Sequence, residues 1–411
     1  MPLLSVDKAR DRILSNFAPL NPETVFLEAC AGRVLAKDIS AANDLPFFDN
    51  SSMDGFAVIA SDLVDVSSPL PRILQVVADI PAGSTSYVTI LSGQAARIMT
   101  GAPMPAGADT VVPVEDTDFQ DRAPGTPPPK WVRVYKAFNA GDFVRPKGSD
   151  IVSGQPVMKA GHRLRAQDLG LLAMLGEAQV FVHKQPRVAL ISSGDELVPV
   201  DAPLLPGKIR DSNTYTLSAL IQAAGGIVLP LGIAEDRRES VASLLNHAAK
   251  KNADLILSSA GVSVGAFDFI KDVVESQGEL GFWRVNMRPG KPLAFGTYRS
   301  IPFIGLPGNP VSAFVGFEVF VRPVLEKLGG LKEITRPKVR VRLAQDVESD
   351  GRESYLRAFV DELNNGTLSA RLAGHQGSGN LLSIVLANAL LIIPAGVKSL
   401  RSGQEIDAWL L

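Results

Sequence analysis

The sequence predicts a multidomain protein in which a doubly wound α/β domain stands beside separate β domains. A chain of 411 residues exceeds what one hydrophobic core needs and is typical of about two to four domains. Between residues 187 and 328, apolar runs alternate with amphipathic helical patterns, which indicates repeated βα units and a mostly parallel sheet. The regions on either side consist of short β-like runs between turns, and the 36 glycines and 29 prolines supply those turns.

The first part of the chain is expected to hold a docking helix and then a β domain. Four apolar residues share one face of a short helix that Ser5 can cap, namely Val6, Ala9, Ile13 and Phe17. We expect this face to dock on another domain. A β domain follows over residues 45–142, and its strand-like runs are 73–78, 87–91, 110–114 and 131–135. Residues 123–130 include three consecutive prolines and predict a surface loop.

The elements of the α/β domain follow from its apolar periodicity. The predicted strands are 188–192, 227–233, 255–259, 293–295 and 303–306. The predicted helices are 166–176, 214–224, 240–251, 267–276 and 311–328. Pro323 lacks an N–H donor, so we expect it to kink the last helix near Val319.

Beyond Gly329 and Gly330 the alternation ends, and a smaller β domain of about 80 residues is expected. Its strand-like runs are 339–343, 355–363 and 367–372. Asn365 and Gly366 join the last two runs, and both residue types tolerate the positive φ of a tight hairpin turn.

Charge and cysteine content exclude several classes of protein. The 41 Lys and Arg residues nearly balance the 43 Asp and Glu residues, and a formal charge of −2 provides no overall field for nucleic acid or an anionic membrane. One cysteine, Cys30, allows no intramolecular disulfide, which favours a reducing, cytoplasmic location. The charged N-terminus is unlike a secretory signal, and the most apolar stretch, 381–397, is too interrupted to span a membrane. We expect neither nucleic acid nor membrane as a partner.

Acidic side chains follow the predicted strands at the edge where doubly wound sheets bind ligands. Asp195 and Glu196 come after the first strand, and Asp268 follows the third. Such oxygen ligands suit Mg²⁺, which takes one or two carboxylates and lets a phosphate complete its shell. For Asp211 and Ser212, which precede a helix, capping of the helix N-terminus is the simpler explanation.

Basic residues and a helix start fall in the second half of the same domain. Arg284, Arg288 and Lys291 lie on a turn-rich loop that leads into a buried-looking strand, which favours oxyanion binding over the usual solvated surface charge. Residues 305–311 join a strand to a helix, with Asn309 suited to the N-cap and Pro310 to the first helical position. Backbone N–H groups there would face an anion, although the same residues also describe an ordinary helix start.

Other common signatures do not occur in the sequence. These are the phosphate-binding loop of nucleotide hydrolases, the dinucleotide-binding glycine motif and the zinc-protease helix motif. The four histidines are scattered, so we assign them structural roles, and Cys30 is expected to be a buried small hydrophobic residue. Three polar segments, 48–55, 97–103 and 147–150, have the composition of turns.

Long segments of the chain resemble the molybdopterin molybdenumtransferase family, which includes MoeA and the E domain of gephyrin. The matching segments occur in the family's order over almost the whole chain and are PFFDNSSMDGFAV, RIMTGAPMPAGADTVV, ISSGDELV, IRDSNTYTL, LILSSAGVSVGAFDFIK, MRPGKPLAFG and GLPGNPVSA. The resemblance implies four domains, of the class multidomain α/β plus β. They are an elongated N-terminal domain (1–44 with 143–180), an inserted β domain (45–142), a Rossmann-like molybdopterin-binding domain similar to molybdopterin adenylyltransferases (181–329) and a C-terminal β-barrel-like domain (330–411).

The resemblance also implies an activity in molybdenum cofactor biosynthesis. A transferase of this kind inserts molybdate into adenylated molybdopterin with Mg²⁺ as cofactor, and cleavage of the adenylate releases AMP. The family implies a homodimer whose cleft combines the α/β domain of one subunit with the β domain of the other. Further implied partners are the molybdopterin adenylyltransferase and proteins that mature molybdoenzymes.

The family's site residues map onto this sequence motif by motif. Its catalytic groups correspond to Asp54, Thr100, Asp150, Glu196 and Asp268, and Glu196 and Asp268 are also the expected metal ligands. Its substrate-binding groups correspond to Asp236, Ser263, Arg284, Arg288, Lys291, Pro307, Pro310, Arg357 and Ser378. Three positions depart from the family's pattern, in that Ser193 replaces a usual Thr, Ala260 a usual Gly and Arg288 a frequent Lys. The methyl group of Ala260 restricts positive φ, so we expect a slightly different loop there.

Two alternatives stand beside the enzyme. A scaffold that keeps the fold but binds a partner, as the gephyrin E domain also does, would be expected to lose the acidic and basic motifs, and here they are largely intact. An adenylyltransferase would be expected to lack the flanking β domains. The sequence hardly distinguishes molybdate from tungstate as the metal substrate.

Overall fold

The computed structural model describes residues 3–85, 87–119, 123, 125–260, 269–334, 336–364 and 366–411. Internal contacts divide the chain into two compact units. Unit 1 comprises Met1–Lys37, Ala160–Ala173 and Glu177–Leu411, and unit 2 comprises Asp38–Lys159 and Met174–Gly176. Each unit is described by itself. The four domain boundaries that the sequence implies stay a prediction.

The centre of unit 1 is a six-stranded sheet in the order β15-β12-β16-β20-β19-β17. Its strands are β12 (Arg187–Ser193), β15 (Ile227–Ala234), β16 (Leu255–Ser259), β17 (Gly278–Arg284), β19 (Pro292–Tyr298) and β20 (Ile301–Leu306). The strands from β15 to β20 in this order run parallel, as the alternating pattern predicts. In contrast, β19 and β17 are antiparallel additions to one edge.

The sequence does not predict β17, because glycines interrupt its pattern. Glycine is depleted in strands, and β17 contains Gly278 and Gly281. A Cβ atom at Gly278 would collide with the carbonyl oxygen of Thr297 on β19, so the close pairing of these two strands requires glycine.

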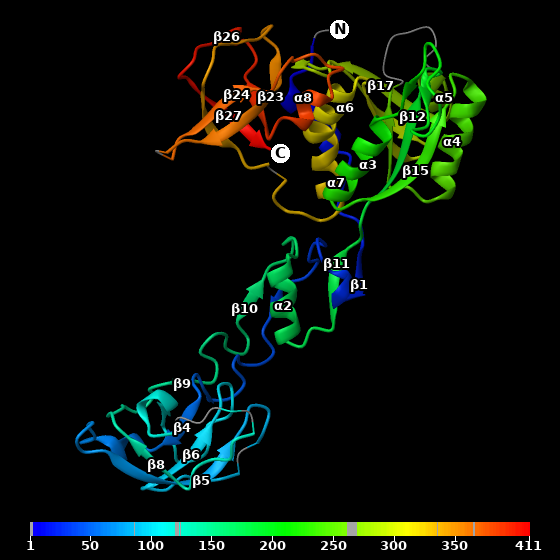
Figure 1. Cartoon of the computed structure of the whole chain (residues 1–411). Helices are drawn as coiled ribbons and strands as arrows, with labels where there is room; N and C mark the ends of the chain where they lie inside the picture. Colours follow the sequence, from blue (N-terminus) through cyan, green and yellow to red (C-terminus); the bar gives the residue numbers. More distant parts are fainter. Residues whose placement is uncertain are drawn as a thin grey trace. The chain divides into compact units, whose positions relative to one another are not determined.

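Helices cover both faces of this sheet (Figure 1). The helices α3 (Asn213–Ala223), α6 (Pro310–Gly316) and α7 (Arg322–Leu328) pack on one face, and α4 (Arg238–Lys250) and α5 (Phe269–Gln277) pack on the other. Because successive strand residues point to opposite faces, the sheet has one hydrophobic core on each face. Leu190 and Leu257 belong to one hydrophobic cluster, whereas their neighbours Ala189 and Ile256 belong to the other.

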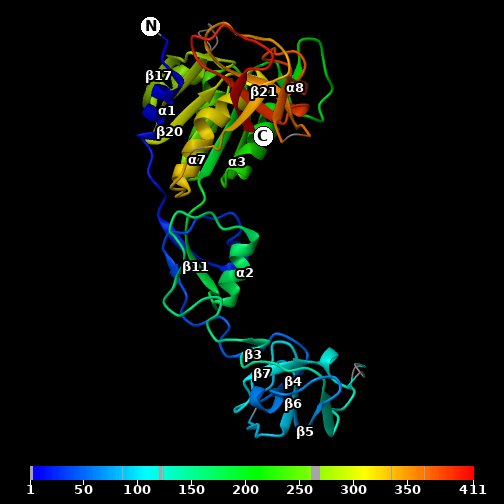
Figure 2. The ribbon, with the colours of Figure 1, turned by 90° about the vertical axis from the view of Figure 1, so that its left-hand side faces the viewer.

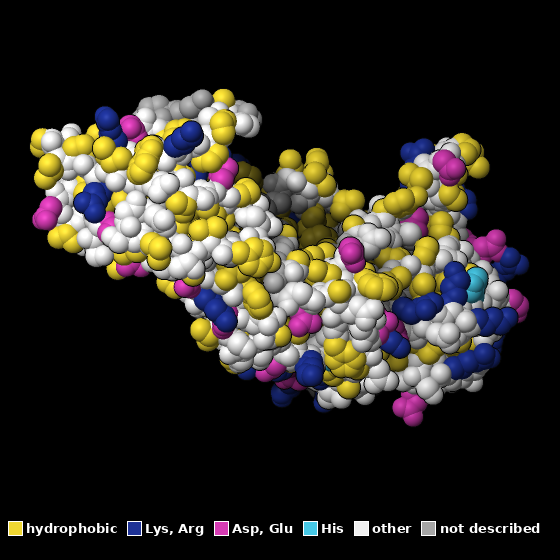
Figure 3. Space-filling view, turned by 90° about the horizontal axis from the view of Figure 1, so that it is seen from below, with side chains coloured by type: hydrophobic (Ala, Val, Ile, Leu, Met, Phe, Trp, Pro, Cys, Tyr) yellow, Lys and Arg dark blue, Asp and Glu magenta, His cyan; other side chains and the backbone are white. Residues whose placement is uncertain are grey.

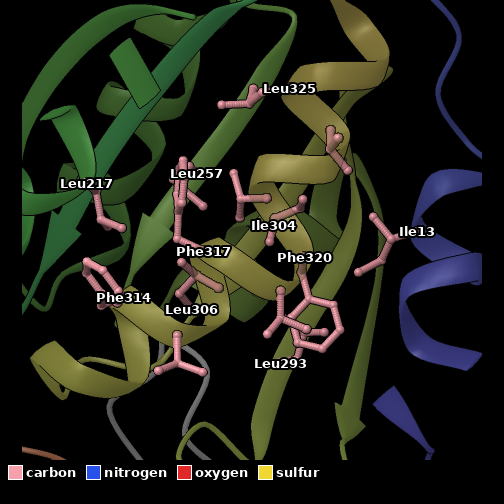
Figure 4. Packing of buried hydrophobic residues seen from close by; sticks show 14 of the residues in the cluster. Ile13, Leu217, Leu257, Leu293, Ile304, Leu306, Phe314, Phe317, Phe320 and Leu325 are labelled. Carbon is pink, nitrogen blue, oxygen red and sulfur yellow. The ribbon is translucent and has the colours of Figure 1, made fainter. Parts of the chain in front are cut away.

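The helical run that ends the α/β region is interrupted by a π-helical turn, η4 (Phe317–Val321), between α6 and α7. Pro323 has no N–H to donate to Val319, so the irregularity falls where the sequence predicts a kink. The turn is nevertheless apolar and buried. Figure 4 shows Phe317 and Phe320 packing toward the strands of the sheet.

The N-terminal helix α1 (Val6–Leu14) lies beside the strands of the α/β sheet (Figure 2). Its residues Val6, Ala9 and Ile13 are buried in the same cluster as α6 and α7, as the one-sided apolar pattern predicts. Oγ of Ser5 accepts a hydrogen bond from the backbone N–H of Lys8 at 3.4 Å, which confirms the predicted cap.

Smaller elements complete the N-terminal part of unit 1. The strand β1 (Pro22–Phe26) pairs antiparallel with β11 (Gln179–His183), and η1 (Leu27–Ala29) follows β1. Helix α2 (Ala166–Met174) carries the buried Asp168 in its first turn. Hydrogen bonds from the side chain and backbone of Arg165, with His162 nearby, hold the pKa of the Asp168 carboxyl well below its usual range.

The C-terminal part of unit 1 is a six-stranded sheet in the order β18-β23-β24-β21-β27-β25, and an additional pairing of β23 with β25 closes it into a barrel. Its strands are β18 (Met287–Arg288), β21 (Val339–Leu343), β23 (Glu353–Glu362), β24 (Leu368–Leu372), β25 (Ala389–Ile393) and β27 (Glu405–Leu410), with β22 (Val347–Glu348), β26 (Ser399–Leu400) and α8 (Leu382–Val385) around them. The predicted hairpin joins β23 to β24. Asn365 lies outside the described residues, and Gly366 has a φ of 77°, as a tight turn requires.

Unit 2 is built on a five-stranded sheet in the order β7-β4-β6-β5-β8. Its strands are β4 (Gly55–Val58), β5 (Arg72–Ile80), β6 (Gln94–Ile98), β7 (Thr110–Pro113) and β8 (Trp131–Val134). Two short strand pairs accompany this sheet: β2 (Ile39–Ser40) pairs with β10 (Pro156–Met158), and β3 (Asn50–Ser51) pairs with β9 (Val144–Arg145). The unit also contains the short 3-10 helices η2 (Ala60–Leu63) and η3 (Val114–Asp116). The strand predicted at 87–91 is wrong. Thr89 forms only an isolated bridge with Ala106, and β6 follows it.

The surface agrees with the near balance of charge. Basic and acidic side chains are interspersed among hydrophobic ones on the face drawn in Figure 3. Among the residues that the structure describes, no helix has the length and apolar character needed to cross a membrane.

Candidate active site

The carboxylates that follow the parallel strands meet where β12 and β15 end. These strands pair in parallel with Ser193 opposite Ala234, so the residues after them lie side by side. The backbone N–H of Asp236 donates to Oδ1 of Asp195 at 3.0 Å, and Oγ of Ser193 donates to Oδ1 of Asp236 at 3.2 Å. Asp195 and Asp236 therefore share the carboxyl edge of the sheet, where ligands bind in this architecture.

Glu196 follows Asp195, and its exposed side chain bends back over Gly194. The Glu196 carboxylate occupies the place of a Cβ atom at position 194 but could move aside, and it is the φ of 147° at Gly194 that favours glycine. The carbonyl oxygen of Glu196 accepts the N–H of Ile209 at 2.8 Å, where β13 (Leu197–Val198) pairs with β14 (Ile209–Arg210). Asp268 and Ser263 lie outside the described residues, so the expected meeting of Glu196 with Asp268 stays a prediction.

Hydroxyl groups connect neighbouring segments at the same edge. Oγ of Ser192 lies 3.0 Å from Oγ1 of Thr214 and 3.3 Å from Oγ of Ser259. Thr214 Oγ1 in turn donates to Oδ2 of the buried Asp211 at 2.6 Å, and the Thr214 N–H donates to Oδ1 at 3.1 Å. Asp211 therefore caps the start of α3, which is the simpler of the two expectations. Ser212 makes no side-chain cap bond.

The loop between β20 and α6 is held by two neighbouring segments. Nδ2 of Asn213 donates to the carbonyl oxygen of Gly308 at 2.8 Å, and the N–H of Ala260 donates to that of Leu306 at 2.9 Å. Ala260 has a φ of 89°, a conformation that costs a residue with a Cβ atom more than it costs glycine. The loop thus keeps the positive φ of a glycine despite its methyl group.

Asn309 contacts the C-terminal part of unit 1 and does not cap α6 with its side chain. Its Nδ2 donates to Oγ of Ser378 at 3.0 Å, and the N–H of Val311 donates to the carbonyl oxygen of Ser378 at 3.1 Å. Asn309 occupies the N-cap position and Pro310 follows it, as predicted, but no side-chain cap bond forms. The N–H of Val311, which the sequence suggests as a donor to an anion, is therefore used within the protein. Pro307 and Pro310 lie on either side of Asn309, the residue whose side chain binds Ser378.

Arg357 lies on β23 and is only 1% exposed. Its Nε donates to Oγ of Ser383 at 3.0 Å, and its Nη2 donates to the carbonyl oxygen of Gly377 at 3.1 Å. Burial and the nearby charge of Arg288 lower the pKa of Arg357 to about 10. The side chain remains a cation at neutral pH, and no carboxylate forms an ion pair with it in the part of the chain that the structure describes.

The basic loop, residues 284–291, contacts both the strand that carries Arg357 and the first turn of α6. Arg288 lies on β18, which pairs in parallel with β23, the strand that carries Arg357. Gly290 lies against α6, because a Cβ atom there would be 3.5 Å from the carbonyl oxygen of Ser312. Arg284 and Lys291 at the ends of the loop are exposed.

These segments converge on one cationic site of unit 1. It joins the basic loop, the start of α6 and the C-terminal barrel, and its residues are Arg288, Asn309, Arg357 and Ser378. Burial and a neighbouring second cation both disfavour the charged guanidinium of Arg357, and a bound anion would offset this cost. The geometry therefore suits a bound oxyanion.

The whole chain matches known proteins. Residues 4–176 match the family model described as the MoeA N-terminal region (domain I and II), residues 189–327 match the probable molybdopterin binding domain, and residues 340–411 match the MoeA C-terminal region (domain IV). The molybdopterin molybdenumtransferase of Nostoc sp. is 38% identical to this chain over 98% of the chain and 94% of its own length. The chain belongs to the MoeA family.

Other relatives in the MoeA family agree along their full lengths. The molybdopterin molybdenumtransferase of Haemophilus influenzae is 34% identical over 98% of both chains. A crystal structure of a molybdopterin biosynthesis MoeA protein from Pyrococcus horikosii superposes with a TM-score of 0.78 at 32% identity, and covers 100% of this chain and 99% of that one. The resemblance seen in the motifs is confirmed, as is the class of enzyme, a transferase of molybdenum cofactor biosynthesis.

In this MoeA-family chain the remaining predicted residues lie in unit 2. Oδ1 of Asp54 accepts hydrogen bonds from the backbone N–H and from Oγ1 of Thr100, both at 2.7 Å, so these two residues meet as one polar group. Asp150 forms an ion pair with Arg145 of β9. Their predicted contribution to the cleft of a partner subunit stays a prediction.

Several residues that build this MoeA-family site carry no individual signal in the sequence. Ser383 and Gln376 hold Arg357 in place, the latter by a hydrogen bond of 3.0 Å from the Arg357 N–H to Oε1 of Gln376. Ser383 interrupts the most apolar stretch of the chain, and a polar residue in such a stretch is the kind of signal that indicates a buried partner. The contact of Asn213 with Gly308 depends on the fold alone.

Proposed function

We propose that this chain inserts molybdate into adenylated molybdopterin, with cleavage of the adenylate and release of AMP and molybdenum cofactor. The observation that carries the proposal is the buried Arg357, which lies near the charge of Arg288. Its guanidinium donates to the carbonyl oxygen of Gly377, the residue before Ser378. Relatives that match along the full length are named molybdopterin molybdenumtransferase, and that name supplies the substrate class.

The cationic site is suited to hold a doubly charged oxyanion. The guanidinium of Arg357 is fixed by Ser383 and Gly377, and it therefore needs little reorganisation when an anion binds. Arg288 adds a second fork of donors and Lys291 a point charge at the rim. We assign molybdate to the buried part of this site, with the phosphates of the substrate at the more exposed cations.

The acidic edge of the sheet is suited to Mg²⁺ through the chemistry of its donors. Glu196 and Asp268 would hold the ion, and the pair Asp195 and Asp236 follows strands β12 and β15 of the same sheet. All four side chains offer carboxylate oxygens, which Mg²⁺ prefers as ligands. When bound, Mg²⁺ would neutralise charge on the phosphates of the substrate. The part of the chain that the structure describes holds no group of three or more His, Cys, Asp or Glu residues placed to bind a metal, so in this proposal substrate oxygens complete the shell.

The proposal extends to the setting of the enzyme. We propose that residues 181–329 act as a Rossmann-like domain similar to molybdopterin adenylyltransferases and that the protein works as a cytoplasmic homodimer. In that arrangement Asp54, Thr100 and Asp150 of one subunit would serve the site of the other. The adenylyltransferase that makes the substrate and proteins that mature molybdoenzymes are the proposed partners.

The test is release of AMP from adenylated molybdopterin by the purified protein in the presence of molybdate and Mg²⁺. Arg357→Met is expected to lower the rate about 100-fold, which is the size of effect seen when one donor to a reacting oxyanion is removed. Arg371→Met is the matched control, because Arg371 is exposed on the neighbouring strand β24.

A second pair of variants tests the acidic groups. Asp54→Ala combined with Glu196→Ala is expected to abolish the reaction. Release of AMP by the wild-type protein that does not exceed that of this double variant would reject the enzymatic assignment.

A further inference from the structure

The arginines of the cationic site supply hydrogen-bond donors and no acceptor. A guanidinium has five N–H donors and nothing that accepts. The Nε and Nη2 atoms of Arg357 already donate to Ser383 and Gly377, whereas its Nη1 has no hydrogen-bond partner among the described residues. Within the same part of the chain, the side chain of Arg288 forms no hydrogen bond or ion pair. Both arginines can therefore donate to a bound anion.

The backbone oxygens next to these arginines already accept hydrogen bonds from the protein. The carbonyl oxygen of Gly377 accepts Nη2 of Arg357 at 3.1 Å. The carbonyl oxygen of Ser378, one residue further, accepts the N–H of Val311 at 3.1 Å. A ligand that brings a donor of its own therefore meets acceptors that are in use.

The carboxylate beside the basic loop is also committed to a neighbour. The backbone N–H and Nε of Arg352 donate to Oδ1 and Oδ2 of Asp350 at 3.1 and 3.0 Å. The hydrogen bond from the Arg352 side chain is the main cause of the lowered pKa of Asp350, and the charge of Arg288 is a smaller one. Among the residues that the structure describes, no carboxylate bonds Arg288 or Arg357. The site thus offers a ligand no carboxylate acceptor in this part of the chain.

The hydroxyl group of Ser378 can both donate and accept, and Asn309 fixes which of the two it does. The Ser378 oxygen accepts Nδ2 of Asn309 at 3.0 Å. The nitrogen of this planar amide faces Ser378, and its oxygen is therefore turned to the other side. The hydroxyl proton of Ser378 has no acceptor among the described residues, so it is left to donate to an anion.

We propose that the cationic site selects tetrahedral dianions that carry no proton, and that Asn309 is the positioning residue for this selectivity. The inference rests on the proposed function, because it refines the assignment of molybdate to this site. Molybdate and sulfate are fully deprotonated at neutral pH and only accept hydrogen bonds, whereas inorganic phosphate keeps at least one P–OH group. In this site the P–OH group has no acceptor, and a donor that is buried without a partner costs affinity. The site therefore admits molybdate and disfavours phosphate.

The test is isothermal titration calorimetry of the full-length protein with sodium molybdate at pH 8, with sulfate or inorganic phosphate as the competitor. Ionic strength is kept constant, because salt screens exposed charges. Sulfate and hydrogen phosphate have nearly the same size and, at this pH, the same charge, so the proton is what separates them. We expect sulfate to compete with molybdate, and phosphate to compete at least about tenfold more weakly than sulfate.

Two variants separate the roles of the two polar side chains. Asn309→Asp replaces the amide with a carboxylate, which accepts a P–OH group, and we expect it to reduce the advantage of sulfate over phosphate at least about threefold. Asn309 is exposed, so this change leaves the core intact. Ser378→Ala removes a donor without adding an acceptor. It is expected to weaken the binding of both anions and to leave their ratio unchanged.

Asn364→Asp is the matched control for the added charge. Asn364 is exposed in the turn between β23 and β24, at the opposite end of β24 from the segment that carries Ser378. Its affinities for molybdate, sulfate and phosphate are expected to equal those of the wild type.

Three results would overturn the inference, namely no binding of molybdate to the wild type, competition by phosphate as strong as that by sulfate, or an unchanged ratio in Asn309→Asp. The AMP-release assay separates this failure from failure of the proposed function. Protein that binds molybdate with the expected selectivity but releases no AMP defeats the proposed reaction alone. Protein that releases AMP but binds phosphate as tightly as sulfate defeats the selectivity instead.

Discussion

Asp168 is a single carboxylate whose charge stabilises the start of α2. It accepts bonds from the N–H and Nε of Arg165 at 2.8 and 3.0 Å, and Nε2 of His162 lies 2.8 Å from Oδ2. Because its pKa is lowered in the folded protein, the stabilisation is complete above the unfolded value of about 3.9 and is lost as the pH falls toward the folded value. We predict that Asp168→Asn lowers the free energy of unfolding by about 1–2 kcal/mol at pH 5, and by less at pH 3.

Urea unfolding of the two proteins at both pH values measures this difference. Asp7→Asn is the control, because the Asp7 carboxylate is exposed in its pair with Arg10. It is expected to change stability little at either pH. A difference between Asp168→Asn and the wild type that stays constant down to pH 3 would contradict the prediction.

Ala260 is one of the three positions at which the sequence departs from the family's motifs. In the folded protein, its φ of 89° costs about 1–2 kcal/mol for a residue with a Cβ atom. A glycine would remove this strain, but it would also stabilise the unfolded chain by up to about 1 kcal/mol, because glycine has more conformational freedom there. We therefore predict that Ala260→Gly raises the thermal unfolding midpoint slightly. Ala395→Gly, in an exposed loop where φ is not positive, should lower it. Differential scanning calorimetry distinguishes the two signs, and equal destabilisation by both would show that Ala260 is unstrained.

At the level of residues, the sequence predicts which chemical groups take part but not what holds them. Asn309 is placed correctly at the N-cap of α6, yet its side chain binds Ser378, because a segment distant in sequence competes for its amide. Asp211 could be a ligand or a cap from its type alone, and the hydrogen bonds to Thr214 decide for the cap. Such choices depend on tertiary neighbours that periodicity does not record.

Among the elements, the interrupted helix of η4 carries a buried ionic network. Glu318 is 3% exposed and accepts Nε and Nη2 of Arg322, both at 2.7 Å, and it also forms an ion pair with Arg336, which in turn bonds the carbonyl oxygen of Leu410. The network ties α7 to the last strand of the barrel. Glu318→Gln would leave two arginines without their shared anion, and we predict a loss of about 3 kcal/mol or more, since breaking one side of a buried pair is costly.

The unfolding midpoint in urea measures this loss. Asp346→Asn is the matched control, because Asp346 pairs with Arg401 at 2.6 Å but both side chains are more than half exposed. Its midpoint is expected to stay close to that of the wild type. If the two variants lose stability equally, burial of the network is not what makes it strong.

At the level of elements, prediction succeeded where the apolar pattern is uninterrupted. The pattern gives β16 with its correct ends, because its apolar run is continuous and buried on both faces, and α4 within two residues at each end, because α4 has one dominant buried face. It fails at β17, whose glycines serve the pairing with β19, and at 87–91, where β-like residues lie in an irregular segment. It also passes over β25, which lies in the apolar stretch 381–397 together with α8.

For the whole molecule, the site residues predicted from the sequence fall in both compact units. The residues of the cationic site, Arg288, Arg357 and Ser378, belong to unit 1, and Asp54 and Thr100 belong to unit 2. The α/β alternation and the two β regions could be predicted from the sequence. The contact of the barrel with the start of α6 was not, because Ser378 and Asn309 are brought together by a long-range pairing that leaves no local pattern.

Unit 2 has the features of a part that folds by itself, and this gives a prediction for the whole chain. Hydrophobic clusters around Phe56 and around Ile98 are formed within it. Its ends are joined by the antiparallel pair β2 and β10 and by an ion pair between Nζ of Lys159 and Oδ2 of Asp38 at 2.9 Å. We predict that a fragment of residues 38–159 unfolds cooperatively in urea, with a midpoint close to one of the transitions of the full chain.

The shorter fragment 45–142, which corresponds to the β domain expected from the sequence, is the matched comparison. It lacks β2, β10 and β9, and so loses the pairing of Asn50 with Arg145 and of Ser51 with Val144. Val144 also packs against one of the two cores, so its removal uncovers apolar surface. The shorter fragment should therefore unfold at a lower urea concentration. Equal midpoints for the two fragments would mean that the domain ends where the sequence places it and that the strands beyond residue 142 add nothing to its stability.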